Sequence, residues 1–157
     1  MTQVVDAQLI EERIQELIDE MTLEEKVGQL TLANGGGGHI PEWLDEGVRR
    51  GRTGSVLNEV DLDTVNELQR LAVEESRLGI PLLVGRDVIH GFRTIFPIPL
   101  GQAATWNPDV VERGARVSAL EAARCGINWT FAPMIDIGRD PRWGRVAETL
   151  GEDPHLT

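Results

Sequence analysis

The first apolar residues of the chain recur every three or four positions: Leu9, Ile10, Ile14, Leu17 and Ile18. That spacing predicts an amphipathic helix from about residue 7 to residue 19. Thr22, with Glu25 three residues later, has the pattern of a capping box and predicts a second, short helix that ends near Leu30. Residues 1–31 are therefore predicted to form an N-terminal helical segment.

Short apolar runs then alternate with longer helical patterns. We predict helices at about 40–50, 63–76 and 107–125, and strands at 54–57, 82–85 and 128–135, and we leave a fourth strand open. The four glycines at 35–38 predict a mobile loop, because they lack the spacings that place backbone amides around a phosphate. Alternating helices and strands are typical of an α/β fold with a parallel sheet.

Two of the apolar runs end in polar clusters. Ile80–Gly85 is followed by Arg86 and Asp87, and Trp129–Ile135 is followed by Asp136. Each run thus delivers a carboxylate at its C-terminal end, with further arginines a few residues later. Because ligands of parallel α/β sheets bind at the carboxyl ends of the strands, this pattern predicts a site for a polar ligand there.

Asp87 is the first candidate site residue. A carboxylate just beyond a buried strand can accept two hydrogen bonds from adjacent sugar hydroxyls, it can pair with Arg93, or it can cap its own turn. Arg93 and Arg145 offer planar, multi-donor contacts to hydroxyl or carboxylate groups. Their alternative partners are the carboxylates of Asp136, Asp140 and Glu148. For Arg142 and Arg139 we favour such ion pairs over ligand contacts.

Two further residues lie in the same loops. His90 follows Asp87 closely, but a general base needs a partner within hydrogen-bond reach, so we favour a structural role for it. Trp143 either stacks on a sugar face or fills space under its loop. Asp87 and Asp136 are the pair of carboxylates that glycoside hydrolysis would need, although nearby arginines suit ionised, ligand-binding carboxylates better than an acid catalyst.

The composition and charge of the chain exclude several classes of function. The chain has 157 residues, 41% of them apolar, which is the size and content of one ordinary packed domain. A net charge of −11 argues against nucleic acid as a partner. Cys125 is the single cysteine, and no zinc-type spacing occurs, so we expect neither a metal nor a cofactor. Residues 1–17 lack the apolar core of a signal peptide, and no run is long enough to span a membrane, so we expect a cytoplasmic protein.

Six blocks of the sequence resemble, in order, motifs of the family-3 glycoside hydrolases. They are Met21–Leu30, Asp87–Gly91, Phe96–Gly101, Asn128–Asp136, Arg139–Arg145 (RDPRWGR) and Glu148–Asp153. The RDPRWGR block is highly specific, and the whole pattern is most similar to bacterial β-glucosidases and β-xylosidases. The resemblance implies a (β/α)8 TIM-type barrel followed by an α/β sandwich domain, and a retaining mechanism acting on β-linked glucosides or oligosaccharides.

By this resemblance, residues 1–157 are the N-terminal part of the barrel domain, and 54–157 supply barrel strands, helices and sugar-binding loops. Asp87 and Arg145 match family residues that hold the hydroxyls of the non-reducing terminal sugar, and Arg93 matches a sugar-contacting arginine found in some members. The resemblance places the nucleophile, the acid/base glutamate and a Lys-His pair outside this sequence, so it implies no catalytic residue here.

The count of strands agrees with an incomplete barrel, since eight strands typically need about 250 residues. The residues alone leave open a small open sheet or the leading portion of something larger. An incomplete barrel exposes sheet edges and helix faces, so we expect self-association or a complementing C-terminal chain. The alternatives are a non-catalytic carbohydrate-binding or assembly fragment and an unrelated small α/β enzyme that uses Asp87 and His90.

Overall fold

The computed structural model describes residues 7–157, so residues 1–6 of the predicted N-terminal segment lie outside the described residues. The two predicted helices are confirmed as α1 (Ala7–Glu20) and α2 (Leu23–Gln29). The capping box is also confirmed: the Glu25 amide donates to Thr22 Oγ1 at 3.2 Å, and the Thr22 amide donates to Glu25 Oε2 at 2.8 Å. No helix within residues 7–157 is both long enough and apolar enough to cross a membrane.

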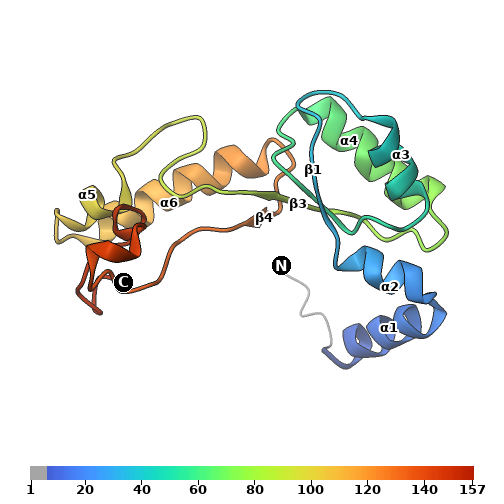
Figure 1. Ribbon diagram of the computed structural model, residues 1–157, viewed down its shortest axis with the longest axis horizontal. Coiled ribbons are helices and arrows are strands. Elements are labelled where there is room, and N and C mark those ends of the chain that lie inside the picture. Colours follow the sequence, from blue (N-terminus) through green and yellow to red (C-terminus); the bar gives the residue numbers. More distant parts are fainter. Residues whose placement is uncertain (1–6) are drawn as a thin grey trace.

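Four parallel strands form one sheet in the order β1-β2-β3-β4 (Figure 1). Their bounds are β1 Leu32–Asn34, β2 Ser55–Leu57, β3 Leu83–Arg86 and β4 Trp129–Thr130. Helices connect each strand to the next: α3 (Glu42–Arg49), α4 (Leu62–Arg70) with a π-helical turn (Leu71–Glu75), and then α5 (Pro99–Ala103) and α6 (Pro108–Ala123). Two 3₁₀ turns follow β4, at Pro141–Trp143 and Val146–Glu148. The predicted α/β fold with a parallel sheet is confirmed.

Two predicted boundaries are wrong. The strand at 128–135 is too long, because regular pairing stops after Thr130 and Pro133 has no amide hydrogen to donate to a ladder. Met134 instead makes an isolated parallel bridge with Thr149. The helix predicted at 63–76 changes to π-helical geometry after Arg70. The fourth strand, left open above, is β1, whose three residues are too few to show a period.

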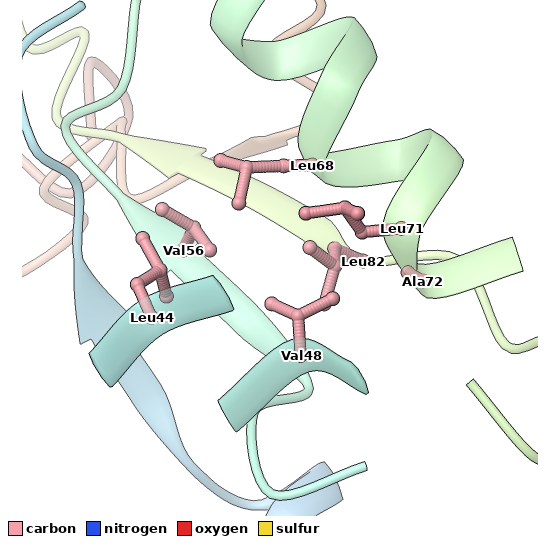
Figure 2. Close-up of a cluster of buried hydrophobic side chains, with 7 residues drawn as sticks. All are labelled: Leu44, Val48, Val56, Leu68, Leu71, Ala72 and Leu82. Atoms are coloured by element: carbon pink, nitrogen blue, oxygen red, sulfur yellow. The ribbon is translucent and has the colours of Figure 1, made fainter. Parts of the chain in front are cut away.

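The apolar core lies on one face of the sheet. One cluster comes from α3, β2, the α4 and π-helical segment and the start of β3: Leu44, Val48, Val56, Leu68, Leu71, Ala72 and Leu82 (Figure 2). A second cluster joins Val84 of β3 to Val65 of α4 and Ala122 of α6. Helices α3, α4 and α6 therefore all cover the same face.

The opposite face of the sheet is bare. Leu32 in β1 is 40% exposed, Leu83 in β3 is 49% exposed, and Phe131 just after β4 is 38% exposed. Phe131 packs on Trp129, with ring centroids 4.5 Å apart, and a Cβ on Gly85 would come within 3.1 Å of the Phe131 ring. Strands that carry helices on one side and apolar side chains on the other have the arrangement of an arc of a (β/α)8 barrel, whose interior is filled by side chains from all its strands.

The glycine-rich loop is anchored by a buried carboxylate. Glu59, fully buried just after β2, accepts hydrogen bonds from the amides of Gly37 at 3.0 Å and Gly38 at 3.2 Å. It also accepts from the amides of Val60 at 3.0 Å and Asp61 at 3.1 Å, at the start of α4. The loop amides thus bind an internal anion, which ties the segment after β1 to the segment after β2.

A second carboxylate joins the N-terminal helices to the rest of the chain. Glu25 is 7% exposed and pairs with Arg77, whose Nη2 lies 2.6 Å from Glu25 Oε2 and also donates to the carbonyl of Glu20 at 2.9 Å. The hydrogen bonds from Arg77 and from the Thr22 amide lower the pKa of Glu25 to about 2, from its ordinary value of 4.5. Arg77 lies beyond the π-helical turn, so this pair closes a long loop of chain.

We predict that Glu59→Ala lowers the free energy of unfolding by about 3 kcal/mol, because it leaves backbone amides of two segments without their charged acceptor. Urea denaturation of the wild type and the variant measures the difference. Glu152→Ala, at an exposed carboxylate, is the matched control and should change stability by less than about 0.5 kcal/mol. Equal stability of Glu59→Ala and wild type would contradict the anchoring role.

A pH dependence follows from Glu25. Its folded-state pKa is lowered, so its contribution to stability is fully present above pH 4.5 and is lost as the pH falls toward 2. We therefore expect the stability difference between wild type and Glu25→Gln to shrink as the pH is lowered from about 5.5 to about 2.5. Urea denaturation over this range is the measurement, with Glu152→Gln as control. If the difference in free energy of unfolding between wild type and Glu25→Gln stayed constant over this pH range, the pair with Arg77 would not be formed.

Candidate functional site

The polar side chains predicted at the carboxyl edge of the sheet come from β3 and from the segment after β4. Asp87, exposed, directly follows the last residue of β3, and Asp136 lies beyond β4. Arg145 lies between the two 3₁₀ turns, where it pairs with Glu148: Nε donates to Oε1 at 3.0 Å and Nη2 to Oε2 at 2.7 Å. We call Asp87, Asp136, Arg145 and Glu148 the carboxylate rim.

Arg145 and Asp87 come from segments that lie side by side, because Glu148, the partner of Arg145, and His90, three residues after Asp87, border one hollow. The hydrogen bonds that Arg145 donates to Glu148 are the main cause that raises the pKa of Arg145, and the charges of Asp136 and Asp87 raise it further. Arg145 also lowers the pKa of Glu148. The side chain of Arg145 remains 53% exposed, so a ligand can reach it.

Local structure fixes the segment that carries Arg145. Asp140 caps the first 3₁₀ turn by accepting a hydrogen bond from the Arg142 amide at 2.9 Å, and its carboxylate pairs with the Arg142 guanidinium. The ion pair favoured for Arg142 is therefore confirmed, whereas the one favoured for Arg139 is not formed among the described residues. Gly144 ends the turn at φ +91°, a left-handed conformation that a side chain would strain. The Trp-Gly-Arg sequence thus turns the chain sharply just before Arg145.

Arg93 is not paired with Asp87. The guanidinium of Arg93 lies 3.4 Å from Cys125 Sγ, near the C-terminal end of α6, and its backbone amide donates to Glu121 at 2.9 Å. Glu121 also accepts hydrogen bonds from the amide and hydroxyl of Thr94. This loop is therefore fastened to α6, and the pairing that sequence spacing allowed between Asp87 and Arg93 is not formed.

His90 and Trp143 differ in their surroundings. His90 Nδ1 lies 2.9 Å from the carbonyl of Phe96, and the Phe96 amide donates to the His90 carbonyl at 2.7 Å. These two contacts close the loop between β3 and α5, which is the structural role favoured for His90. Trp143 is 44% exposed, so it is not buried beneath its loop.

Sequence reasoning missed a second polar group at the same edge. Asn34, Asn58 and Arg86 stand at the carboxyl ends of β1, β2 and β3, and hydrogen bonds connect the three side chains. Asn34 and Asn58 each stand at the end of a short strand, before Gly35 and Glu59. Asparagine is common in turns, so its position there does not by itself predict a role in a site. The position of Arg86 immediately before Asp87 was the one usable sign.

A large hollow lies beside the carboxylate rim. It measures about 840 Å³ and is lined mainly by small residues of α6, by the loop that contains His90, and by residues 132–134. Glu148 also borders it, but Asp87 and Arg145 do not. Its small apolar lining suits packing side chains better than the hydroxyls of a sugar, so we place the candidate site at the rim.

Two carboxylates of the segment after β4 have shifted pKa values. Hydrogen bonds from arginines lower the pKa of Glu148, in the rim, and of Asp140, in the turn before it. A general acid needs the opposite shift, so these two groups suit binding rather than proton donation. Among residues 7–157, no group of three or more His, Cys, Asp or Glu side chains is arranged to hold a metal ion.

Comparison with known proteins identifies the chain's relatives. Residues 8–157 match the model of the glycosyl hydrolase family 3 N-terminal domain. A periplasmic beta-glucosidase of Salmonella typhimurium is 45% identical over 144 residues, which cover 92% of this chain and 19% of that protein. A putative beta-xylosidase of Formosa agariphila is 35% identical, over 94% of this chain and 22% of its own length. The chain thus spans about a fifth of the length of these relatives.

Comparison with solved structures finds relatives of the same kind. The crystal structure of a D270A mutant beta-glucosidase from Listeria innocua, in complex with laminaribiose, has a TM-score of 0.79 and 39% sequence identity. The match covers 92% of this chain and 22% of that structure. The TIM-barrel type of α/β fold, and the presence of only part of it in these 157 residues, are therefore confirmed.

Proposed function

Because the chain belongs to glycosyl hydrolase family 3, we propose that it holds the non-reducing terminal sugar of a β-linked glucoside or oligosaccharide. The observation that supports this proposal is geometric: Asp87 directly follows β3, and Glu148, the partner of Arg145, borders the same hollow as His90, three residues after Asp87. Sugar hydroxyls donate to carboxylates and accept from guanidinium groups, so the two side chains offer complementary contacts to one pyranose. The relatives named beta-glucosidase support this substrate class.

The proposed activity of the complete protein is retaining, exo-acting hydrolysis of β-glycosides. That reaction needs one carboxyl group as acid and one carboxylate as nucleophile. We propose that both lie outside this chain, because the chain spans about a fifth of its relatives and Glu148 at the rim is already paired with Arg145. In this reading the 157 residues bind a sugar but do not hydrolyse glycosides alone.

A complementing C-terminal chain, or self-association, is the second part of the proposal. The exposed apolar residues of the bare sheet face, Leu32, Leu83 and Phe131, support it, as do the unpaired edges of β1 and β4 in the described sheet. The same observations favour the other candidate function, a carbohydrate-binding or assembly fragment that acts only with a second chain. The two readings differ in whether the completed site hydrolyses its ligand.

We predict that Asp87→Asn weakens the binding of glucose by at least about tenfold, because the amide replaces a charged acceptor of two hydroxyl hydrogen bonds. The dissociation constant is measured by titrating the chain with glucose and following the amide resonances. Asp63→Asn, at an exposed position in the first turn of α4, is the matched control and should bind glucose as the wild type does. Unchanged affinity in Asp87→Asn would contradict the assignment of this carboxylate.

We expect no measurable turnover of an aryl β-glucoside by the chain alone, and turnover only when a C-terminal part of a relative is added. Release of the aryl alcohol is followed by absorbance, with and without the added chain. Robust hydrolysis by the chain alone that disappears in Asp87→Ala would contradict the absence of catalytic groups.

Light scattering is expected to show species larger than a monomer, because bare apolar surface drives association. A monomer with a cooperative unfolding transition would contradict the proposed self-association.

A further inference from the structure

The described sheet has two unpaired edges. β1 and β4 each have a neighbouring strand on one side only. The N-terminal helices that lead into β1 lie toward one end of the molecule, and α6 and the C-terminal segment that follows β4 lie toward the other (Figure 1). The two edges therefore do not meet within one chain. Exposed strand edges are templates for pairing with another chain.

The bare face of the sheet has the side chains of a barrel interior. Leu32 and Leu83 point away from the helices, because the residues that follow them, Ala33 and Val84, pack against the helix-covered core. On the same bare face, the rings of Trp129 and Phe131 pack over Gly85. Apolar side chains from alternate strand positions fill the interior of a closed (β/α)8 barrel. The four described strands amount to half of the eight that close such a barrel.

The chain exposes more surface than its mass predicts. Its solvent-accessible surface is 10374 Å². A folded monomeric protein of 17.3 kDa exposes about 7,800 Å², so this chain has an excess of about 2,500 Å². Obligate homodimers bury between about 2,000 and 5,000 Å² in total. Two copies together have an excess of about 5,000 Å², which is enough for a stable dimer.

We propose that two copies of this chain close one eight-stranded parallel barrel, in which β4 of each copy pairs with β1 of the other. This rests on the self-association proposed above and specifies its geometry. A twofold rotation about the barrel axis keeps every strand parallel, so the order β1-β2-β3-β4 continues from one copy into the next. The two junctions are identical by symmetry, and no strand edge is left unpaired.

The hollow beside α6 agrees with this arrangement. It is lined by β4 and by small residues of α6, so it reaches the strand at the unpaired edge. Helices α1 and α2 lead into β1, so those of the other copy come next to β4 in the closed barrel. Their exposed apolar side chains, among them Ile10, Ile14 and Val27, can pack into the small-residue lining of the hollow.

Charge opposes the association. Each copy has a net charge of −11, so two copies repel each other at long range. Salt screens that repulsion, and burial of apolar surface does not depend on it. The dissociation constant of the dimer is therefore expected to fall as the salt concentration rises. A dissociation constant that rises with salt would contradict an apolar interface.

Sedimentation of the 157-residue chain gives the mass and the dissociation constant. Wild type is expected to form a single species of twice 17.3 kDa, the mass of one chain. Leu83→Lys places a charge in the barrel interior and should raise the dissociation constant at least about a hundredfold. Leu120→Lys is the matched control, because Leu120 is an exposed apolar residue of α6 that does not line the hollow, and it should leave the dissociation constant unchanged.

Cross-linking identifies which strands pair. Ala33→Cys chains, altered in β1, are mixed with Thr130→Cys chains, altered in β4, and treated with a short bismaleimide. The expected product joins one chain of each kind. Neither variant alone should cross-link to itself, because equal positions of the two copies lie on opposite sides of the closed barrel. Cys125 is buried, and wild type treated in the same way is its control.

The outcomes separate closure of the barrel from self-association. A dimer without the mixed cross-link would overturn the barrel and indicate that two bare faces stack instead. A series of larger species would overturn closure, because edge pairing that does not close continues into a filament. A monomer would contradict the self-association proposed above as well as the barrel. The glucose titration of Asp87→Asn tests the sugar site independently of all three results.

Discussion

Parallel pairing of the four strands is the constraint on which the rest of the structure depends. Because β1 to β4 run in the same direction and in sequential order, their carboxyl ends meet at one edge. Asp87 and Arg145, 58 positions apart in the sequence, both lie in segments that follow strands at this edge. Buried Glu59 and the backbone bonds past β1 and β2 hold the loops at this edge in place. A slip in strand pairing would separate the two halves of the site.

The same sheet shows that these residues form only part of a TIM-barrel-type domain. Helices α3, α4 and α6 cover one face, while Leu32, Leu83 and Phe131 leave the other open. In a closed barrel that second face is the interior, filled by strands that this chain does not contain. An open arc can still fix the relative positions of the side chains at its edge, because hydrogen bonds between adjacent strands hold the strands in register. Binding and catalysis can therefore lie on separate parts of the polypeptide.

Local signals in the sequence predicted most of the fold. The Thr22–Glu25 capping box, the Asn107-Pro108 helix start and the apolar run before Asp87 are short-range patterns, and the structure confirms each. The two-residue length of β4 and the π-helical turn depend on neighbours far away in the sequence. Position after a strand predicted that Asp87 stands at the carboxyl edge of the sheet. The contact of Arg93 with Cys125 and the hydrogen bonds of Asn58 to Asn34 and Arg86 depend on side-chain geometry that spacing does not encode.

Amide chemical-shift mapping with glucose tests most directly whether the carboxyl edge of the sheet is the sugar site. The account predicts that glucose shifts the amide resonances of residues 87–91 and 145–148, which come from separate segments and meet only at this edge. Resonances of α1 and of the outer surface of α3 should not move. Shifts confined to the residues that line the hollow beside α6, or to the N-terminal helices, would contradict the account.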